Sequence, residues 1–201
     1  MIRADLHFHT CYSQDATNSP KRIVEKLNSH PTIKAIAVTD HNTLEGYRKT
    51  HELAEDYPDI LIIPGVEISA EEGEIILLGA TRLPPEPWTV RNVIEHAKQN
   101  RILTVASHPY RGLGLGDKAV RYELDAIETL NGITPPNLNR RAEELAKMKG
   151  LPGVAGSDSH FPHDPWNVCT EIQAPLEVDE ILAAIRKGAV KVSFTEKSIH
   201  F

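Results

Sequence analysis

The sequence predicts an α/β fold in which a largely parallel sheet closes into a small or distorted barrel. Short apolar runs alternate with helical patterns along the chain, and most of these runs are almost continuously apolar. Such runs are typical of strands that are buried on both faces. A complete (β/α)8 barrel usually takes ~250 residues. The 201 residues of this chain therefore favour a smaller or distorted barrel, with an open doubly wound sheet as the alternative.

Eight apolar runs are predicted to be strands, and the segments between them carry helix signals. Ser19 before Pro20, Thr43 and Thr89 can each cap a helix, and apolar residues follow at helical spacing. The same spacing recurs after residues 138 and 178, and Gly188 can end the last helix. The predicted strands cover residues 1–6, 33–38, 60–63 with 66–68, 75–78, 102–106, 126–130, 154–155 and 190–194.

The composition is that of an ordinary globular protein, with 40% hydrophobic and 25% charged residues. The length suits one domain over residues 1–201. No apolar stretch approaches the ~20 residues of a membrane span, and the N-terminus does not resemble a signal peptide, so we expect a cytoplasmic protein without a membrane partner. The formal net charge of −6 argues against binding to long duplex nucleic acid.

Histidines gather where the predicted strands end. In a parallel α/β fold these ends share one face, so side chains from distant segments meet there. His7 and His9 are two residues apart and point the same way if they lie on a strand, and Asp158 and His160 repeat this spacing. Imidazoles and carboxylates without thiolate pairs suit Zn²⁺, Mn²⁺ or Fe²⁺. The predicted metal ligands are His7, His9, Asp15, His41, Glu67, His108, Asp158 and His160.

Five motifs in order along the chain resemble those of the polymerase and histidinol phosphatase (PHP) family. They are Asp5-Leu-His-Phe-His-Thr, Thr39-Asp-His-Asn-Thr, Gly65-Val-Glu-Ile-Ser, Ser107-His-Pro and Gly156-Ser-Asp-Ser-His. The resemblance implies a distorted (β/α)7 barrel with a trinuclear metal site at the C-terminal ends of the strands. It also implies hydrolysis of phosphate esters.

The resemblance further implies how two to three divalent ions divide the ligands. The first ion is expected at His7, His9, Glu67 and Asp158, and the third at Asp15, His41 and His160. Glu67 would bridge to a second ion held by His108. Many members of the family provide a further histidine for this second ion, but Asn131 stands at about that place here. Either the Asn131 oxygen or water would fill the position.

The predicted function is hydrolysis of a phosphate ester by a metal-bound hydroxide. Asp40 is expected to lie behind the ligands, where it could orient an imidazole. Arg111 either reaches into the same mouth and clamps phosphate or is a solvated surface residue. The sequence does not identify a general acid. The expected substrate is a small phosphorylated molecule or the end of a nucleic acid.

Two rival functions remain open at this point. Amidohydrolase-type metal hydrolases also begin with two histidines on the first strand, but they commonly use a modified lysine on a middle strand, and Glu67 stands at such a strand end here. The second rival is a non-catalytic PHP module that binds metal without turnover.

Overall fold

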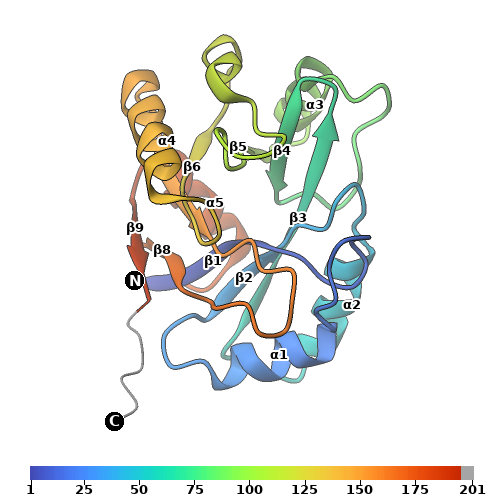
Figure 1. Ribbon diagram of the computed structural model, residues 1–201. Coiled ribbons are helices and arrows are strands. Elements are labelled where there is room, and N and C mark those ends of the chain that lie inside the picture. The colour runs from blue at the N-terminus through green and yellow to red at the C-terminus, as the bar shows by residue number, and fades with distance from the viewer. Residues whose placement is uncertain (196–201) are drawn as a thin grey trace.

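Nine strands form one mixed sheet that curls into a nearly closed barrel in the computed structural model, which describes residues 1–195 (Figure 1). The order across the sheet is β7-β6-β5-β4-β3-β2-β1-β8-β9. The predicted distorted α/β barrel is therefore confirmed. The strands are β1 (Ile2–Phe8), β2 (Ala35–Val38), β3 (Leu61–Ala70), β4 (Gly73–Leu78), β5 (Leu103–Ala106), β6 (Ala126–Asn131), β7 (Gly153–Gly156), β8 (Val168–Ile172) and β9 (Val190–Phe194).

The prediction of a largely parallel sheet is wrong in two places. The strand β4 runs antiparallel to both β3 and β5, because a tight hairpin at Gly73 joins it directly to β3. The strands β8 and β9 form an antiparallel pair beside β1. The apolar pattern of the sequence does not predict β8, because Val168–Ile172 contains polar residues and does not form an apolar run.

The barrel closes between β1 and the segment that follows β7. The N–H of Asp158 donates to the carbonyl of His7 at 2.8 Å, and the N–H of His9 donates to the carbonyl of Ser159 at 3.1 Å. The first residues of β1 pair instead with β8. Gly156 permits the close approach, because a Cβ atom there would lie 2.2 Å from the Cβ of His7. The closure therefore brings the ends of β1 and β7 side by side.

Five α-helices and a short 3-10 helix are found among residues 1–195. Ser19 and Thr89 cap α1 and α3 as predicted. Thr43 does not cap α2, which begins at Glu45; its hydroxyl instead accepts the Glu45 N–H at 3.2 Å, within the preceding turn. The helices are α1 (Pro20–Ser29), α2 (Glu45–Ala54), α3 (Val90–Gln99), η1 (Gly116–Arg121), α4 (Pro136–Lys149) and α5 (Val178–Arg186).

The helices lie around the sheet and bury its apolar surface. α1 and α2 lie next to each other, and α4 lies on the far side of the barrel from them (Figure 1). Gly188 follows α5 with a left-handed φ of 69°, as expected of a glycine that ends a helix. No helix within residues 1–195 has both the length and the apolar character needed to cross a membrane.

Candidate metal centre

His7 and His9 face each other at the end of β1. Their Nε2 atoms are 3.0 Å apart, and both side chains are fully buried. The Oε2 atom of Glu67 lies 3.2 Å from His7 Nε2 and 3.5 Å from His9 Nε2. The Oδ1 atom of Asp158 lies 3.3 Å from both nitrogens. Four potential ligand atoms, from β1, β3 and the segment after β7, therefore surround one point, as expected from the sequence for the first ion.

A second group surrounds the other oxygen of Glu67. Oε1 of Glu67 is 3.3 Å from His108 Nε2, and it has no hydrogen-bond partner among the described residues although it is buried. Glu74 of β4, which the sequence analysis did not predict, lies 3.7 Å from the same nitrogen. Ser69 and Glu74 are opposite each other across the β3–β4 hairpin, so hairpin register is the signal that could have revealed it.

The third group lies at the mouth of the centre. His41 Nε2 and His160 Nε2 are 3.5 and 3.4 Å from Oδ2 of Asp15, whose side chain is 54% exposed. The imidazole rings of His9 and His160 are 4.2 Å apart between centroids, so this group borders the first one. The structure thus brings all eight sequence-predicted ligands together in one place.

Glu128 of β6 supports the centre from behind and was also missed. Its Oε1 atom is 3.0 Å from Nδ1 of His7, and its Oε2 atom accepts the backbone N–H of His108 at 2.7 Å. A carboxylate on one nitrogen of an imidazole orients the other nitrogen toward a metal and fixes the tautomer. Glu128 therefore directs His7 Nε2 into the first group.

Asp40 lies behind the centre, as predicted, but it does not contact an imidazole directly. It accepts hydrogen bonds from the Thr10 N–H at 2.6 Å and from the Thr10 hydroxyl at 2.7 Å. Ser13 contacts the imidazole instead: its Oγ atom lies 3.2 Å from His9 Nδ1 and accepts the His41 N–H at 2.9 Å. Asp40 therefore fixes the backbone of Thr10, directly after His9.

Arg111 reaches into the mouth of the centre, and the interpretation as a freely solvated residue is wrong. Its Nε donates to the Thr134 hydroxyl at 2.9 Å, and Nη2 is hydrogen-bonded to Oδ2 of Asp158. The side chain of Arg111 is only 28% exposed.

Asn131 does not offer a free oxygen to a metal ion. Its Oδ1 atom accepts hydrogen bonds from the Thr134 hydroxyl at 2.9 Å and from the Ile133 N–H at 3.2 Å.

Two of the site residues have left-handed backbone conformations. The φ angles of His108 and Asp158 are 22° and 56°, which is uncommon for residues with a Cβ atom. Such strain persists only where the surroundings enforce it, and it is concentrated at functional sites. In this chain it turns both side chains back toward Glu67 just beyond the ends of β5 and β7.

The electrostatics of the centre favour a cation. Burial opposes charge on His7, but Asp158, Glu128 and Glu67 outweigh it and raise the pKa of His7 well above its usual value. Burial lowers the pKa of His9 to about 4, so this ring is neutral at pH 7 and keeps a lone pair for a metal. Burial and the charge of Glu67 raise the pKa of Glu74. Glu67 and Glu74 are buried and have no Lys or Arg partner within residues 1–195. Such carboxylates fit the donor set of a divalent metal centre.

The centre opens into a cleft of about 580 Å³. Asp15, His41 and Glu74 line it, together with the exposed side chains Tyr12 and Leu113. This volume is enough for a small phosphorylated molecule.

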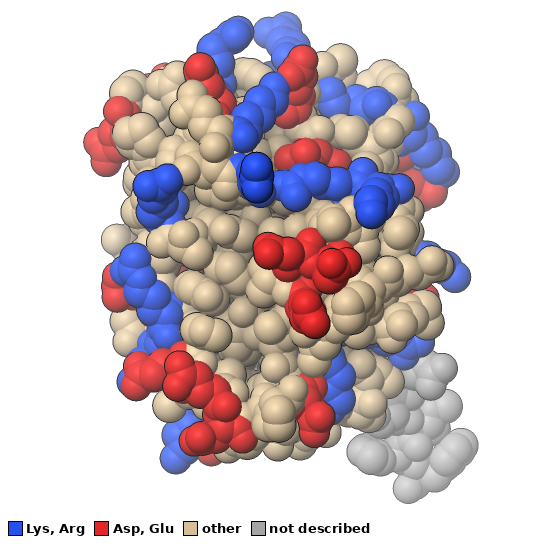
Figure 2. Space-filling view, turned by 180° about the vertical axis from the view of Figure 1, so that it is seen from behind, with Lys and Arg blue, Asp and Glu red and all other residues tan. Residues whose placement is uncertain are grey.

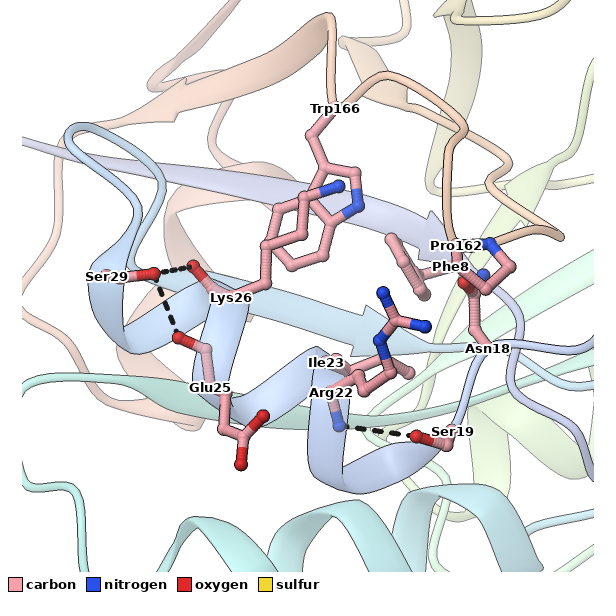
Figure 3. A pocket seen from close by; sticks show the side chains of 10 residues that line it. All are labelled: Phe8, Asn18, Ser19, Arg22, Ile23, Glu25, Lys26, Ser29, Pro162 and Trp166. Carbon is pink, nitrogen blue, oxygen red and sulfur yellow. Dashed lines mark hydrogen bonds between the residues drawn. The ribbon is translucent and has the colours of Figure 1, made fainter.

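A separate cavity of about 310 Å³ lies against α1, on the face of β1 opposite to the ligand cluster (Figure 3). Phe8 lines it, because successive strand residues point to opposite faces. Arg22 and Lys26 extend across it from α1, and Lys26 Nζ lies 4.4 Å from the centroid of Trp166. The ligand cluster is therefore on the other side of the strand from this cavity.

Comparison with known families agrees with this arrangement. The PHP domain family matches residues 5–113, and a PHP-associated family matches residues 136–190. The chain belongs to the PHP domain family. Two uncharacterized proteins of Methanocaldococcus jannaschii are related to this PHP chain. One is 33% identical over 142 residues (65% of this chain, 82% of the relative), and the other is 27% identical over 172 residues (80% and 66%).

Solved structures share the fold at low sequence identity. A two-domain protein of Bacteroides vulgatus, which contains a predicted PHP-like metal-dependent phosphoesterase, has a TM-score of 0.81 and 19% identity over 96% of this chain. This chain covers 64% of that protein. A candidate metal-dependent phosphoesterase of Bifidobacterium adolescentis has a TM-score of 0.68 and 17% identity. The alignment covers 94% of this chain and 96% of the Bifidobacterium chain. An amidohydrolase of Chromobacterium violaceum with bound sulfate has a TM-score of 0.64 and 16% identity, with coverage of 94% and 97%.

Proposed function

We propose that this PHP chain is a metal-dependent phosphoesterase that acts at the cleft around Glu67. The observation that carries the proposal is the position of this carboxylate, since Oε2 faces His7 and His9 while Oε1 faces His108. A carboxylate between two ligand groups is suited to bridge two ions. Two to three Zn²⁺, Mn²⁺ or Fe²⁺ ions would supply Lewis acidity and an activated water. Their proposed ligands are His7, His9, Asp15, His41, Glu67, His108, Asp158 and His160.

Residues of the chain itself would hold the phosphate and the ligands in place. The guanidinium of Arg111 has the planar donors that bind phosphate oxygens in pairs, and it already lies beside Asp158. Glu128 keeps His7 oriented from behind, and Asp40 holds the backbone of Thr10, directly after His9. The role of Asp40 is therefore to position ligands.

The proposed substrate is a small phosphate ester or a phosphorylated end of a nucleic acid. The cleft of about 580 Å³ is open at Asp15, so a terminal phosphate can enter. The net charge of −6 disfavours long duplexes. On the face that Figure 2 shows, Asp and Glu lie directly beside a band of Lys and Arg, so this face offers no uniformly basic track.

The test is phosphate release by protein stripped with a chelator and reloaded with Zn²⁺, Mn²⁺ or Fe²⁺. The panel should hold sugar phosphates, nucleotides and short oligonucleotides, with amides and lactones beside them. We expect metal-dependent phosphate release that Asp158→Asn abolishes and that Asp59→Asn, an exposed control, leaves unchanged. Turnover of amides or lactones alone would favour the amidohydrolase function. Metal binding without any turnover would favour a non-catalytic module.

A further inference from the structure

We infer that Glu74 is a ligand of the second ion and supplies the contact that Asn131 does not provide. This inference rests on the metal centre proposed above and adds one residue to it. The second ion would then lie between β3, β4 and the end of β5, held by Glu67, Glu74 and His108.

Asn131 is already committed to other contacts. Its Oδ1 atom accepts two hydrogen bonds, from the Thr134 hydroxyl and the Ile133 N–H. Its Nδ2 group donates to Glu128 and to Asp158, each at 3.1 Å. The amide therefore braces two carboxylates of the centre, and no oxygen of Asn131 remains to face the second ion.

Glu74 reaches the second ion from the neighbouring strand. It lies opposite Ser69 in the β3–β4 ladder, and Glu67 is two residues before Ser69 on the same face of β3. Oε2 of Glu74 is 3.7 Å from Nε2 of His108, and Oε1 is 3.7 Å from Nδ1 of His41. Both carboxylate oxygens therefore point at imidazoles of the centre.

The burial of the Glu74 carboxylate also favours a bound cation beside it. The residue is only 6% exposed, and its one side-chain hydrogen bond within residues 1–195 is a long one of 3.5 Å from the Ser69 hydroxyl. The buried Oε1 of Glu67, which lacks a hydrogen-bond partner in the same part of the chain, faces the same space. Buried carboxylate oxygens with few hydrogen-bond donors are stabilised when they coordinate a metal ion.

The ligand set predicts which ion this position prefers. His108 would provide one nitrogen, and Glu67 and Glu74 would provide oxygens. Oδ2 of Asp158 lies 3.9 Å from His108 Nε2, but it already accepts hydrogen bonds from Arg111 and Asn131. The other two groups contain at least two imidazoles each. An oxygen-rich site suits Mn²⁺ better than the imidazole-rich groups do.

The test is the number of bound Mn²⁺ and Zn²⁺ ions, measured by mass spectrometry after dialysis against a fixed free concentration of each. The variants are Glu74→Gln, which keeps the shape and removes the charge, and the control Glu71→Gln on the same hairpin, which is exposed. We expect Glu74→Gln to lose one equivalent of Mn²⁺, or to bind it at least about tenfold more weakly. Glu71→Gln should match the wild type.

A third variant distinguishes the loss of a metal ligand from a folding defect. Glu74→His supplies an imidazole in place of the carboxylate and should shift the second position from Mn²⁺ toward Zn²⁺. Glu74→Gln with the wild-type number and affinity of Mn²⁺ ions would overturn the role of Glu74, and so would an unchanged metal preference in Glu74→His. A wild-type protein that binds no ion would instead contradict the metal centre as a whole, which keeps the two failures distinct.

Discussion

Nδ1 of His7 lies 3.0 Å from Oε1 of Glu128, and this contact turns Nε2 of the same ring toward His9. The two residues are 121 positions apart, on β1 and β6. The contact shows that the centre consists of more than its candidate ligands, since a carboxylate from a strand that does not pair with β1 orients an imidazole.

Glu128→Gln should therefore weaken metal binding, although Glu128 is not a proposed ligand. The amide keeps one acceptor oxygen, while its NH₂ group only donates, so glutamine cannot serve both Nδ1 of His7 and the backbone N–H of His108. We expect metal affinity to fall roughly 10–100-fold. Titration with Mn²⁺ or Zn²⁺ measures it, with the exposed Glu95→Gln as control. Equal affinities in both variants would refute the orienting role.

Arg111→Ala should impair phosphate binding more than metal binding. The guanidinium supplies donors beside Asp158 at the metal centre, and donors that bind phosphate commonly contribute about 10²-fold to the rate. We expect a loss of kcat/KM of roughly that size and weaker inhibition by inorganic phosphate, with an unchanged number of bound ions. Arg140→Ala, an exposed arginine at the start of α4, is the control. A loss of metal in Arg111→Ala would show instead that Arg111 serves to position Asp158.

Gly156→Ala should destabilise the barrel. An added Cβ would lie 2.2 Å from the His7 Cβ and 2.6 Å from the His7 nitrogen, so β1 and β7 would have to separate. We expect a loss of about 3 kcal/mol in the free energy of unfolding. Gly150→Ala adds a methyl group in open space and costs only the left-handed backbone, about 1 kcal/mol. Urea unfolding in chelator compares them, and equal losses would argue against tight closure at Gly156.

His30 should make the folded state less stable in mild acid. Burial, with Lys26 and Lys34 nearby, lowers its pKa below the usual 6.5, and Nδ1 accepts the N–H groups of Thr32 and Ile33. As the pH falls below about 6.5, the unfolded chain takes up a proton that the folded chain resists, so stability declines.

The measurement is urea unfolding at about pH 7.5 and about pH 5.5, in chelator, for the wild type and His30→Asn. Asparagine can accept the same N–H groups and does not titrate. The wild type should lose more stability than the variant on acidification. The same loss in both proteins would exclude His30 as the cause.

The sequence was enough to predict the strand-end histidines, because a spacing of two places side chains on one face of a strand. The pair His7 and His9 follows this rule, and the structure brings the two side chains together. Asp158 and His160 join them from beyond β7, where the left-handed φ of Asp158 departs from strand geometry. The barrel class followed from the alternation of apolar runs and helices. These features are local, so pattern and spacing reveal them.

The prediction of Glu74, Glu128 and strand β8 requires non-local information. Glu74 reaches the centre through the register of an antiparallel hairpin, while the sequence analysis assumed parallel strands. Glu128 looks like an ordinary polar residue in the run Ala126–Asn131, and only barrel closure puts it behind His7. The polar residues of β8 fit into the sheet because β1 and β9 pair with it.

The central claim is that His7, His9, Glu67 and Asp158 surround a divalent ion. The most direct measurement is anomalous diffraction from crystals grown with Mn²⁺ or Zn²⁺, recorded at the absorption edge of that metal. We predict an anomalous peak within coordination distance, about 2 Å, of both Nε2 atoms of His7 and His9. A map with full protein density and no peak between these two rings would contradict the account.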